Sequence, residues 1–123
     1  MSPTQTLFTE LAKEAAGGHL FLEPDAASTC AQACTDFLEV LNTLLIQTDR
    51  LCCKEAFGHL PSARALGQKF DDKAIGPGGF AEVLQQHIDT VTRMKDLFEA
   101  AGKAYIEAEG ENVRAFATIT GGR

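Results

Sequence analysis

The stretch that decides the fold is "PDAASTCAQACTDFLEVLNTLLIQTDRLCCKE", residues 24 to 55. Small or apolar side chains recur in it at alternating steps of three and four residues, at Ala27, Cys30, Cys34, Phe37, Leu41, Leu44, Thr48 and Leu51. That spacing places them on one face of a helix in a heptad pattern. Leu38, Leu45 and Cys52 widen the stripe, while Pro24 and Asp25 suit a first helical turn. The stretch therefore predicts one long helix that ends near Glu55.

A second long helix is predicted from Phe80 onwards. Its stripe advances by four and three residues in turn, through Phe80, Leu84, His87, Val91, Met94, Phe98, Ala101 and Tyr105. Val83 and Ile88 widen it, as is usual for a helix that packs in a bundle. In the stripe, His87 is interpreted as a core or interface residue whose ring nitrogens find partners, because buried polar groups are normally hydrogen-bonded.

Shorter elements flank the two long helices. A helix is predicted from Thr4 to about Ala16, where the glycines at 17 and 18 end it. Gly58 and Pro61 make one stop between the long helices, and "GPGG" at 76 to 79 makes another. A short helix from Pro61 to about Ala74 fits between them, with Ala63, Leu66 and Phe70 directed inward.

Together these elements predict an all-α fold, an antiparallel hairpin of two long helices with an extra short N-terminal helix. Because two helices leave apolar surface uncovered, we expect dimerisation to complete a four-helix bundle. The predicted parts are a short helix and linker at 1–20, the hairpin domain at 21–110 and a C-terminal tail at 111–123. The tail repeats an apolar step, so it either continues the helix or frays. The predicted helix–helix or dimer interface comprises Phe37, Leu41, Leu44, Leu51, Leu84, Val91, Met94 and Phe98.

Composition narrows the function classes. The 123 residues are 45% hydrophobic and 23% charged, which is typical of one folded soluble domain. The net charge of −6 argues against nucleic acid or an anionic membrane surface as the main partner. No apolar run is long enough to span a membrane. The first 18 residues lack the basic and unbroken apolar regions of a Sec-type signal peptide.

No catalytic constellation stands out, and no cofactor motif is present. Ser62 is close to His59 in sequence only, and "GPGG" lacks the Lys and Ser or Thr of a phosphate loop. The four cysteines, Cys30, Cys34, Cys52 and Cys53, do not have the spacing of a disulfide framework or a zinc finger. They are interpreted as small apolar residues. A thiol- or metal-binding bundle built on Cys30, Cys34 and His87 is the weaker alternative.

The helical pattern and three sequence features resemble the small helical-hairpin proteins of actinobacterial type VII (ESX) secretion, the WXG-like class. The features are "FLEPDAASTCAQACTDFLEVL" at 21 to 41, "AFGHLPSARALGQKF" at 56 to 70 and "LQQHIDTVTRMKDLFEAAGKAYIEAE" at 84 to 109. The last of these ends in Tyr-x-x-x-Glu. In that family this motif forms part of the export signal that the secretion ATPase reads. The resemblance implies that Tyr105 and Glu109 are the export determinant.

The chain departs from the family at the turn between the long helices. The family carries Trp-x-Gly there, whereas this chain has no Trp and places Phe57 directly before Gly58. The resemblance is therefore to a divergent member, whose partner chain could supply the aromatic half of the signal. Tyr105 also continues the apolar stripe, so it is either the end of the core or part of the signal. Residues at i and i+4 share one helix face, so Tyr105 and Glu109 can form a single small epitope.

Two functions from different classes follow. The first is a non-enzymatic substrate or accessory protein of type VII secretion, which dimerises with itself or with a related chain. It would be cytoplasmic before export and then secreted or cell-surface. The second is a cytoplasmic adaptor that targets a larger secreted effector without leaving the cell.

Overall fold

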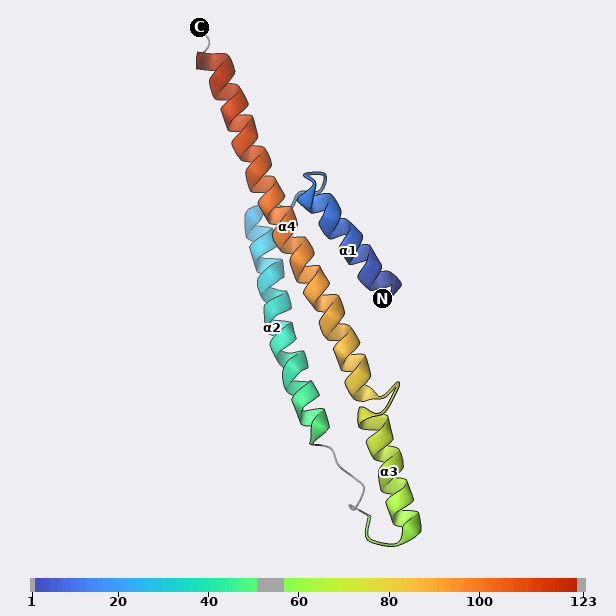
Figure 1. Cartoon of the computed structure of the whole chain (residues 1–123). Coiled ribbons are helices and arrows are strands. Elements are labelled where there is room, and N and C mark those ends of the chain that lie inside the picture. Colours follow the sequence, from blue (N-terminus) through green and yellow to red (C-terminus); the bar gives the residue numbers. More distant parts are fainter. Residues whose placement is uncertain (1, 51–56, 122–123) are drawn as a thin grey trace. The chain divides into compact units, whose positions relative to one another are not determined.

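The computed structural model of the chain describes residues 2–50 and 57–121 (Figure 1). These residues form helices α1 (Pro3–Ala16), α2 (Pro24–Asp49), α3 (Pro61–Ile75) and α4 (Phe80–Gly121), and no strand occurs among them. The all-α prediction is confirmed. The chain divides into two compact units, unit 1 (Met1–Asp36 with Thr90–Arg123) and unit 2 (Phe37–Asp89), which are considered separately below.

Helix α1 begins at a complete capping box. The Gln5 backbone N–H donates to Ser2 Oγ at 3.2 Å, and the Ser2 backbone N–H donates to Gln5 Oε1 at 3.3 Å. Pro3 occupies the first turn, where its missing N–H needs no partner. The Gly17 N–H donates to the Lys13 carbonyl and ends the helix. The predicted helix from Thr4 to Ala16 is thus present, with its start one residue earlier.

In unit 1, α1 runs parallel to α4. Gln5 Nε2 donates to Thr90 Oγ1 at 3.2 Å, and one helical turn further Arg93 Nη1 donates to Thr9 Oγ1 at 2.8 Å. Beyond these polar contacts lies the core of the unit, formed by the buried residues Ala15, Leu97 and Ala101. Partly buried apolar side chains of α1 and the following linker pack around it, namely Phe8, Leu11, Ala12, Leu20 and Leu22.

The first part of α2 lies on the other side of α4 and runs antiparallel to it (Figure 1). Just before α2, the Leu22 N–H donates to the Ala101 carbonyl at 3.1 Å. Gly102 permits the close approach of the two helices, because a Cβ there would lie 2.6 Å from the Ala27 Cβ. The small residues at 100 to 102 thus hold α1 on one side of α4 and α2 on the other.

In unit 2, α3 is bounded as its glycines and prolines predict. Pro61 occupies its first turn, and at its other end the Gly76 N–H donates to the Asp72 carbonyl at 2.9 Å. Gly78 has φ 74°, which favours glycine, and a Cβ at Gly79 would lie 2.6 Å from the Lys73 carbonyl oxygen. The "GPGG" stretch is therefore a tight turn that separates α3 from α4.

The buried line of α2 differs from the predicted stripe. Residues seven apart are buried, at Ala27, Cys34, Leu41 and Thr48. The alternate positions Phe37 and Leu44 are 51% and 36% exposed, whereas Leu38 and Leu45 on the opposite flank are half-buried. Phe37 and Leu44, predicted to lie in a helix–helix or dimer interface, are therefore not buried within the chain itself. The apolar face of α2 is wider than the part of it that is buried. The periodicity of the sequence identifies this face but does not show which of its residues lie at the centre of the buried part.

Thr48 is fully buried in unit 2, at 1% exposure. Its hydroxyl donates to the Leu44 carbonyl one turn earlier at 2.8 Å. The hydrogen bond inside the helix removes the penalty for burying the hydroxyl, so threonine is tolerated among apolar neighbours. Leu41 and Leu84 are the other buried residues of the predicted stripes in this unit.

Two further predictions need correction. His87, interpreted as a core or interface residue, is exposed and so does not belong to the core of the chain. Leu66 and Phe70, predicted to point inward from α3, are 46% and 51% exposed. Helix α2 is described as far as Asp49, and its predicted end near Glu55, with Leu51, Cys52 and Cys53, lies outside the described residues.

Gly110 does not end α4. The helix continues to Gly121, so the predicted boundary between hairpin domain and tail at 110 falls inside one helix. A glycine inside a helix costs about 1 kcal/mol relative to alanine, which the hydrogen bonds on either side outweigh here.

Candidate functional site

Tyr105 and Glu109 lie one turn apart on α4, in unit 1. Tyr105 is half-buried and Glu109 is exposed. Both belong to an unbroken stretch of helix that extends well past them in each direction. Between them, Ile106 is 59% exposed. The two side chains can therefore present one accessible epitope, an aromatic ring with an anionic group beside it.

Phe57 and Gly58, the predicted turn motif, lie just before α3 in unit 2. Gly58 has φ 101°, a conformation that non-glycine residues rarely adopt. Phe57 is 47% exposed, and its ring contacts that of Phe70 with centroids 5.6 Å apart and planes tilted by 35°. Phe57 and Gly58 therefore form a turn with an accessible aromatic side chain.

The predicted interface residues separate into three groups. Leu41, Leu84 and Val91 are buried, and Met94 and Phe98 are half-buried. Phe37 and Leu44 are exposed, and Leu51 lies outside the described residues. The buried residues stabilise the fold of the chain itself. Of the predicted interface residues that the structure describes, the exposed ones can contribute a substantial new surface to a partner.

The exposed apolar residues of unit 2 extend beyond those that the pattern selected. On α2, Val40 is 52% exposed and lies one turn from both Phe37 and Leu44. At the start of α4, Phe80 and Val83 are 49% and 40% exposed. We call these five residues the apolar flank. Sequence reasoning placed Phe37, Leu44 and Phe80 in its stripes but missed Val40, because one residue outside a regular stripe gives no periodic signal.

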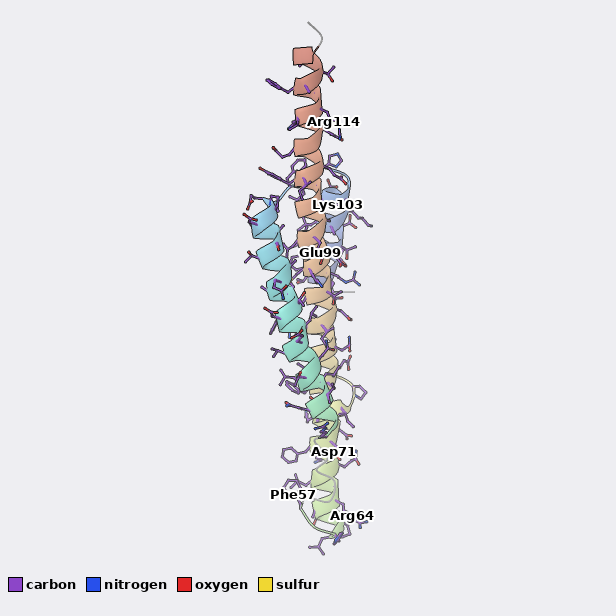
Figure 2. All side chains as sticks on the ribbon, turned by 90° about the vertical axis from the view of Figure 1, so that its left-hand side faces the viewer. Phe57, Arg64, Asp71, Glu99, Lys103 and Arg114 are labelled. Atoms are coloured by element: carbon purple, nitrogen blue, oxygen red, sulfur yellow. The ribbon has the colours of Figure 1, made fainter. Side chains whose placement is uncertain are left out.

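A groove of about 710 Å³, which no sequence pattern predicted, lies between α2 and α4 in unit 1. Small residues from both helices line it, including Ala27, Ala31 and Gly102. Its α4 wall carries two ion pairs at i,i+4 spacing, Lys95–Glu99 at 3.8 Å and Lys103–Glu107 at 4.0 Å. Figure 2 shows Glu99 and Lys103 along this part of α4. Exposed ion pairs of this kind stabilise a folded protein by about 0.3–0.5 kcal/mol each. They therefore contribute little to stability and lie on a side of the groove that faces solvent.

Cys30 and Cys34 behave as small apolar residues of α2. Both are free thiols, Cys34 buried and Cys30 half-buried. Burial raises the pKa of the Cys34 thiol, and the neighbouring Cys30 raises it further, while Lys95 opposes the shift. A raised pKa keeps the thiol neutral, which disfavours both nucleophilic attack and metal binding.

Among residues 2–50 and 57–121, no three or more His, Cys, Asp or Glu side chains converge as metal ligands would. The alternative of a metal-binding bundle on Cys30, Cys34 and His87 therefore gains no support from the described residues. Cys52 and Cys53 lie outside them.

Comparison with protein-family models, with curated proteins and with solved structures finds no match to this chain. Within the described part of the chain, no helix has both the length and the apolar character needed to cross a bilayer.

Proposed function

We propose that this chain is a non-enzymatic helical protein of type VII secretion, exported as a dimer, with Tyr105 and Glu109 as its export determinant. The observation that carries the proposal is the placement of these two residues on α4. Tyr105 is half-buried and thereby held in position, while Glu109 one turn later is exposed. An aromatic ring whose rotamers are already restricted loses little entropy when a receptor binds it.

The dimer is the second part of the proposal. Helices α2 and α4 would act as an antiparallel hairpin, and the apolar flank would pack against a second chain to complete a four-helix bundle. The apolar flank has five apolar side chains. Four of them are between 40% and 52% exposed, and Leu44 is 36% exposed. Phe37, Val40 and Leu44 lie on successive turns of α2, and exposed apolar side chains that cluster in this way commonly mark a protein–protein interface. The second chain is either another copy or a related WXG-like chain.

Fractionation of a type VII-competent actinobacterial host tests the proposal. The tagged protein should appear in the culture supernatant or at the cell surface, and should remain in the cytoplasm when the secretion ATPase is inactivated. Export that continues without the ATPase would contradict the type VII assignment.

The same experiment separates the proposal from the adaptor alternative. An adaptor remains in the cytoplasmic fraction of the wild-type host, and its loss traps a larger effector inside the cell. The proposed function instead predicts that the chain itself crosses the envelope.

A further inference from the structure

The α4 side of the groove carries charges that alternate in sign. Lys95, Glu99, Lys103 and Glu107 all line the groove, and each lies four residues from the next. Lys95 is half-buried and the other three are exposed. Residues four apart form a ridge along a helix, so these side chains make one ridge that is about 18 Å long. We call these four residues the charged ridge.

The rest of the groove is lined by uncharged residues, most of them small. On α2 these are Pro24, Ala27, Ser28, Ala31, Gln32 and Thr35, and on α4 they are Gly102 and Ile106. Ile106 is 59% exposed, so a large apolar side chain is accessible beside the charged ridge. Helix α1 packs on another side of α4, around Leu97 and Ala101. The groove and the ridge therefore form an accessible surface without net charge.

The order of the charges is self-complementary when the ridge meets a second copy of itself in the antiparallel direction. Positions 95 and 107 are each six residues from position 101, and positions 99 and 103 are each two residues from it. Lys95 then faces Glu107 of the second copy. Glu99 likewise faces Lys103 of the second copy, and two-fold symmetry repeats each contact. A parallel pairing in register would instead oppose identical charges.

We propose that the groove binds a second copy of this chain, with the charged ridges of the two copies side by side and antiparallel. Ridges of this type interdigitate where two helices cross at about 50°. The small residues on α2 leave space for the second ridge, and Ile106 contributes apolar contact. The alternating charges set the direction and the register of the pairing, since complementary charges contribute more to specificity than to affinity.

This contact goes beyond the proposed export function and does not rest on it. It uses neither Tyr105 nor the apolar flank. Because the groove exposes one large apolar side chain, Ile106, whereas the flank exposes five, the groove contact forms at higher protein concentrations than the flank dimer. To remove the flank dimer, the association experiments use a Val40→Asp/Leu44→Asp background, in which both changes fall on exposed side chains.

An exchange of charges within one ion pair tests the pairing. Lys95→Glu/Glu99→Lys leaves the net charge unchanged and keeps opposite charges at i,i+4 within α4. Between copies, however, it makes the charges at positions 95 and 107 alike, and also those at positions 99 and 103. Sedimentation equilibrium should therefore show association that is weaker than that of the parent by about tenfold or more.

Lys95→Glu/Glu107→Lys is the matched control, with the same net charge and the same change at position 95. It places like charges at i,i+4 within α4, which weakens the helix slightly. Between copies it keeps opposite charges at positions 95 and 107, and Glu99 still faces Lys103. The control should therefore retain its helical circular dichroism spectrum and still form a complex of twice the 13.2 kDa chain mass.

A mixing experiment tests the same contact without relying on the control. An acidic ridge, Lys95→Glu/Lys103→Glu, and a basic ridge, Glu99→Lys/Glu107→Lys, should each be monomeric alone and should associate in a 1:1 mixture. Three results would overturn the proposal. They are a parent that stays monomeric at all concentrations, which would leave the groove to another partner, a Lys95→Glu/Glu99→Lys chain that associates like the parent, and a mixture that fails to associate.

Discussion

Gly102 is the residue on which the packing of α2 against α4 depends most directly. A methyl group at Gly102 would lie 2.6 Å from the Ala27 Cβ, which is far inside the contact distance of two carbons. The Ala27 Cβ is fixed to the backbone, so a whole helix must move to relieve the clash. Overpacking of this kind costs about 1–3 kcal/mol, against a gain of roughly 1 kcal/mol in helix propensity.

Gly102→Ala is therefore expected to destabilise the protein by about 1 kcal/mol, or roughly 4 °C in Tm. Gly110→Ala is the matched control in the same helix, because a Cβ there meets nothing within 4 Å. Propensity alone should then raise stability by up to about 1 kcal/mol. Thermal unfolding of both variants measures these changes in stability. Equal shifts of Tm with the same sign would contradict the close approach of Gly102 to Ala27. Ala27→Gly should restore the Gly102→Ala variant.

Cys34 predicts a stability change at alkaline pH. Because burial and Cys30 raise its pKa above the ordinary value of 9.0, the folded state holds the thiol proton more tightly than the unfolded state. The associated stabilisation is complete below pH 9.0 and is lost as the pH rises through the raised pKa. Urea unfolding across that range should show a decline in the free energy of unfolding that is shallower in Cys34→Ser. Parallel slopes would mean that Cys34 titrates normally.

At the scale of elements, α1 depends on its capping box. Ser2→Ala removes the hydroxyl that accepts the Gln5 N–H, and should cost about 1 kcal/mol in the free energy of unfolding. Thr4→Ala, an exposed residue of the same first turn, is the control and should change stability by a few tenths at most. If chemical denaturation finds the two variants equivalent, the cap does not hold α1.

Residues 111–119 of α4 should behave differently from the rest of the helix in hydrogen exchange. An isolated helix of this length is marginal in water, and each of these residues is exposed. At low protein concentration, amides from 112 to 121 should exchange much faster than those around the buried Leu97 and Ala101. Uniform slow exchange along α4 at low concentration would contradict this account.

The elements also show how far sequence reasoning reaches. The bounds of α3 were predictable, because Pro61 and the glycines at 76 to 79 act locally, whereas the Ser2 cap was not identified and α1 begins one residue earlier than predicted. The rotation of α2 was not predictable either, since Phe37, Leu38, Leu44 and Leu45 all lie in one wide apolar sector. The sequence analysis left open whether α4 continues past Gly110. Helix propensity sets the cost of one glycine against an otherwise helical stretch, and this comparison alone does not decide where the helix ends.

The candidate site was predictable only as a pattern. Tyr105 and Glu109 follow from the spacing and the resemblance to type VII secretion proteins, and the structure adds their exposure. The groove between α2 and α4 and the exposure of Phe70 depend on contacts between segments distant in sequence. The sequence has neither a periodic pattern nor a motif at those positions, so these contacts could not be predicted from it.

At the scale of the whole molecule, apolar side chains are exposed in both units. The apolar flank belongs to unit 2, and Val113 and Ile119 on the C-terminal part of α4 belong to unit 1. The account assigns the flank to the proposed dimer. A chain of this size gains stability from covering such surfaces, because its own core is small.

The flank predicts a dimer that a single charge can disrupt. Phe37→Asp places a carboxylate in the proposed interface while the side chain remains in water in the isolated chain. Light scattering should then report a loss of dimer with an unchanged helical circular dichroism signal. Gln32→Asp, an exposed polar position of the same helix, should leave the dimer intact. A dimer that persists in Phe37→Asp would place the interface elsewhere.

Export of Tyr105→Ala in a type VII-competent host tests the central claim most directly, with Glu107→Ala as the matched control. Glu107 is exposed on the same stretch of α4 and lies between the two proposed signal residues without being one of them. The account predicts that Tyr105→Ala accumulates in the cytoplasm with its helical content intact, while Glu107→Ala is exported like the wild type. Normal export of a folded Tyr105→Ala protein would contradict the account.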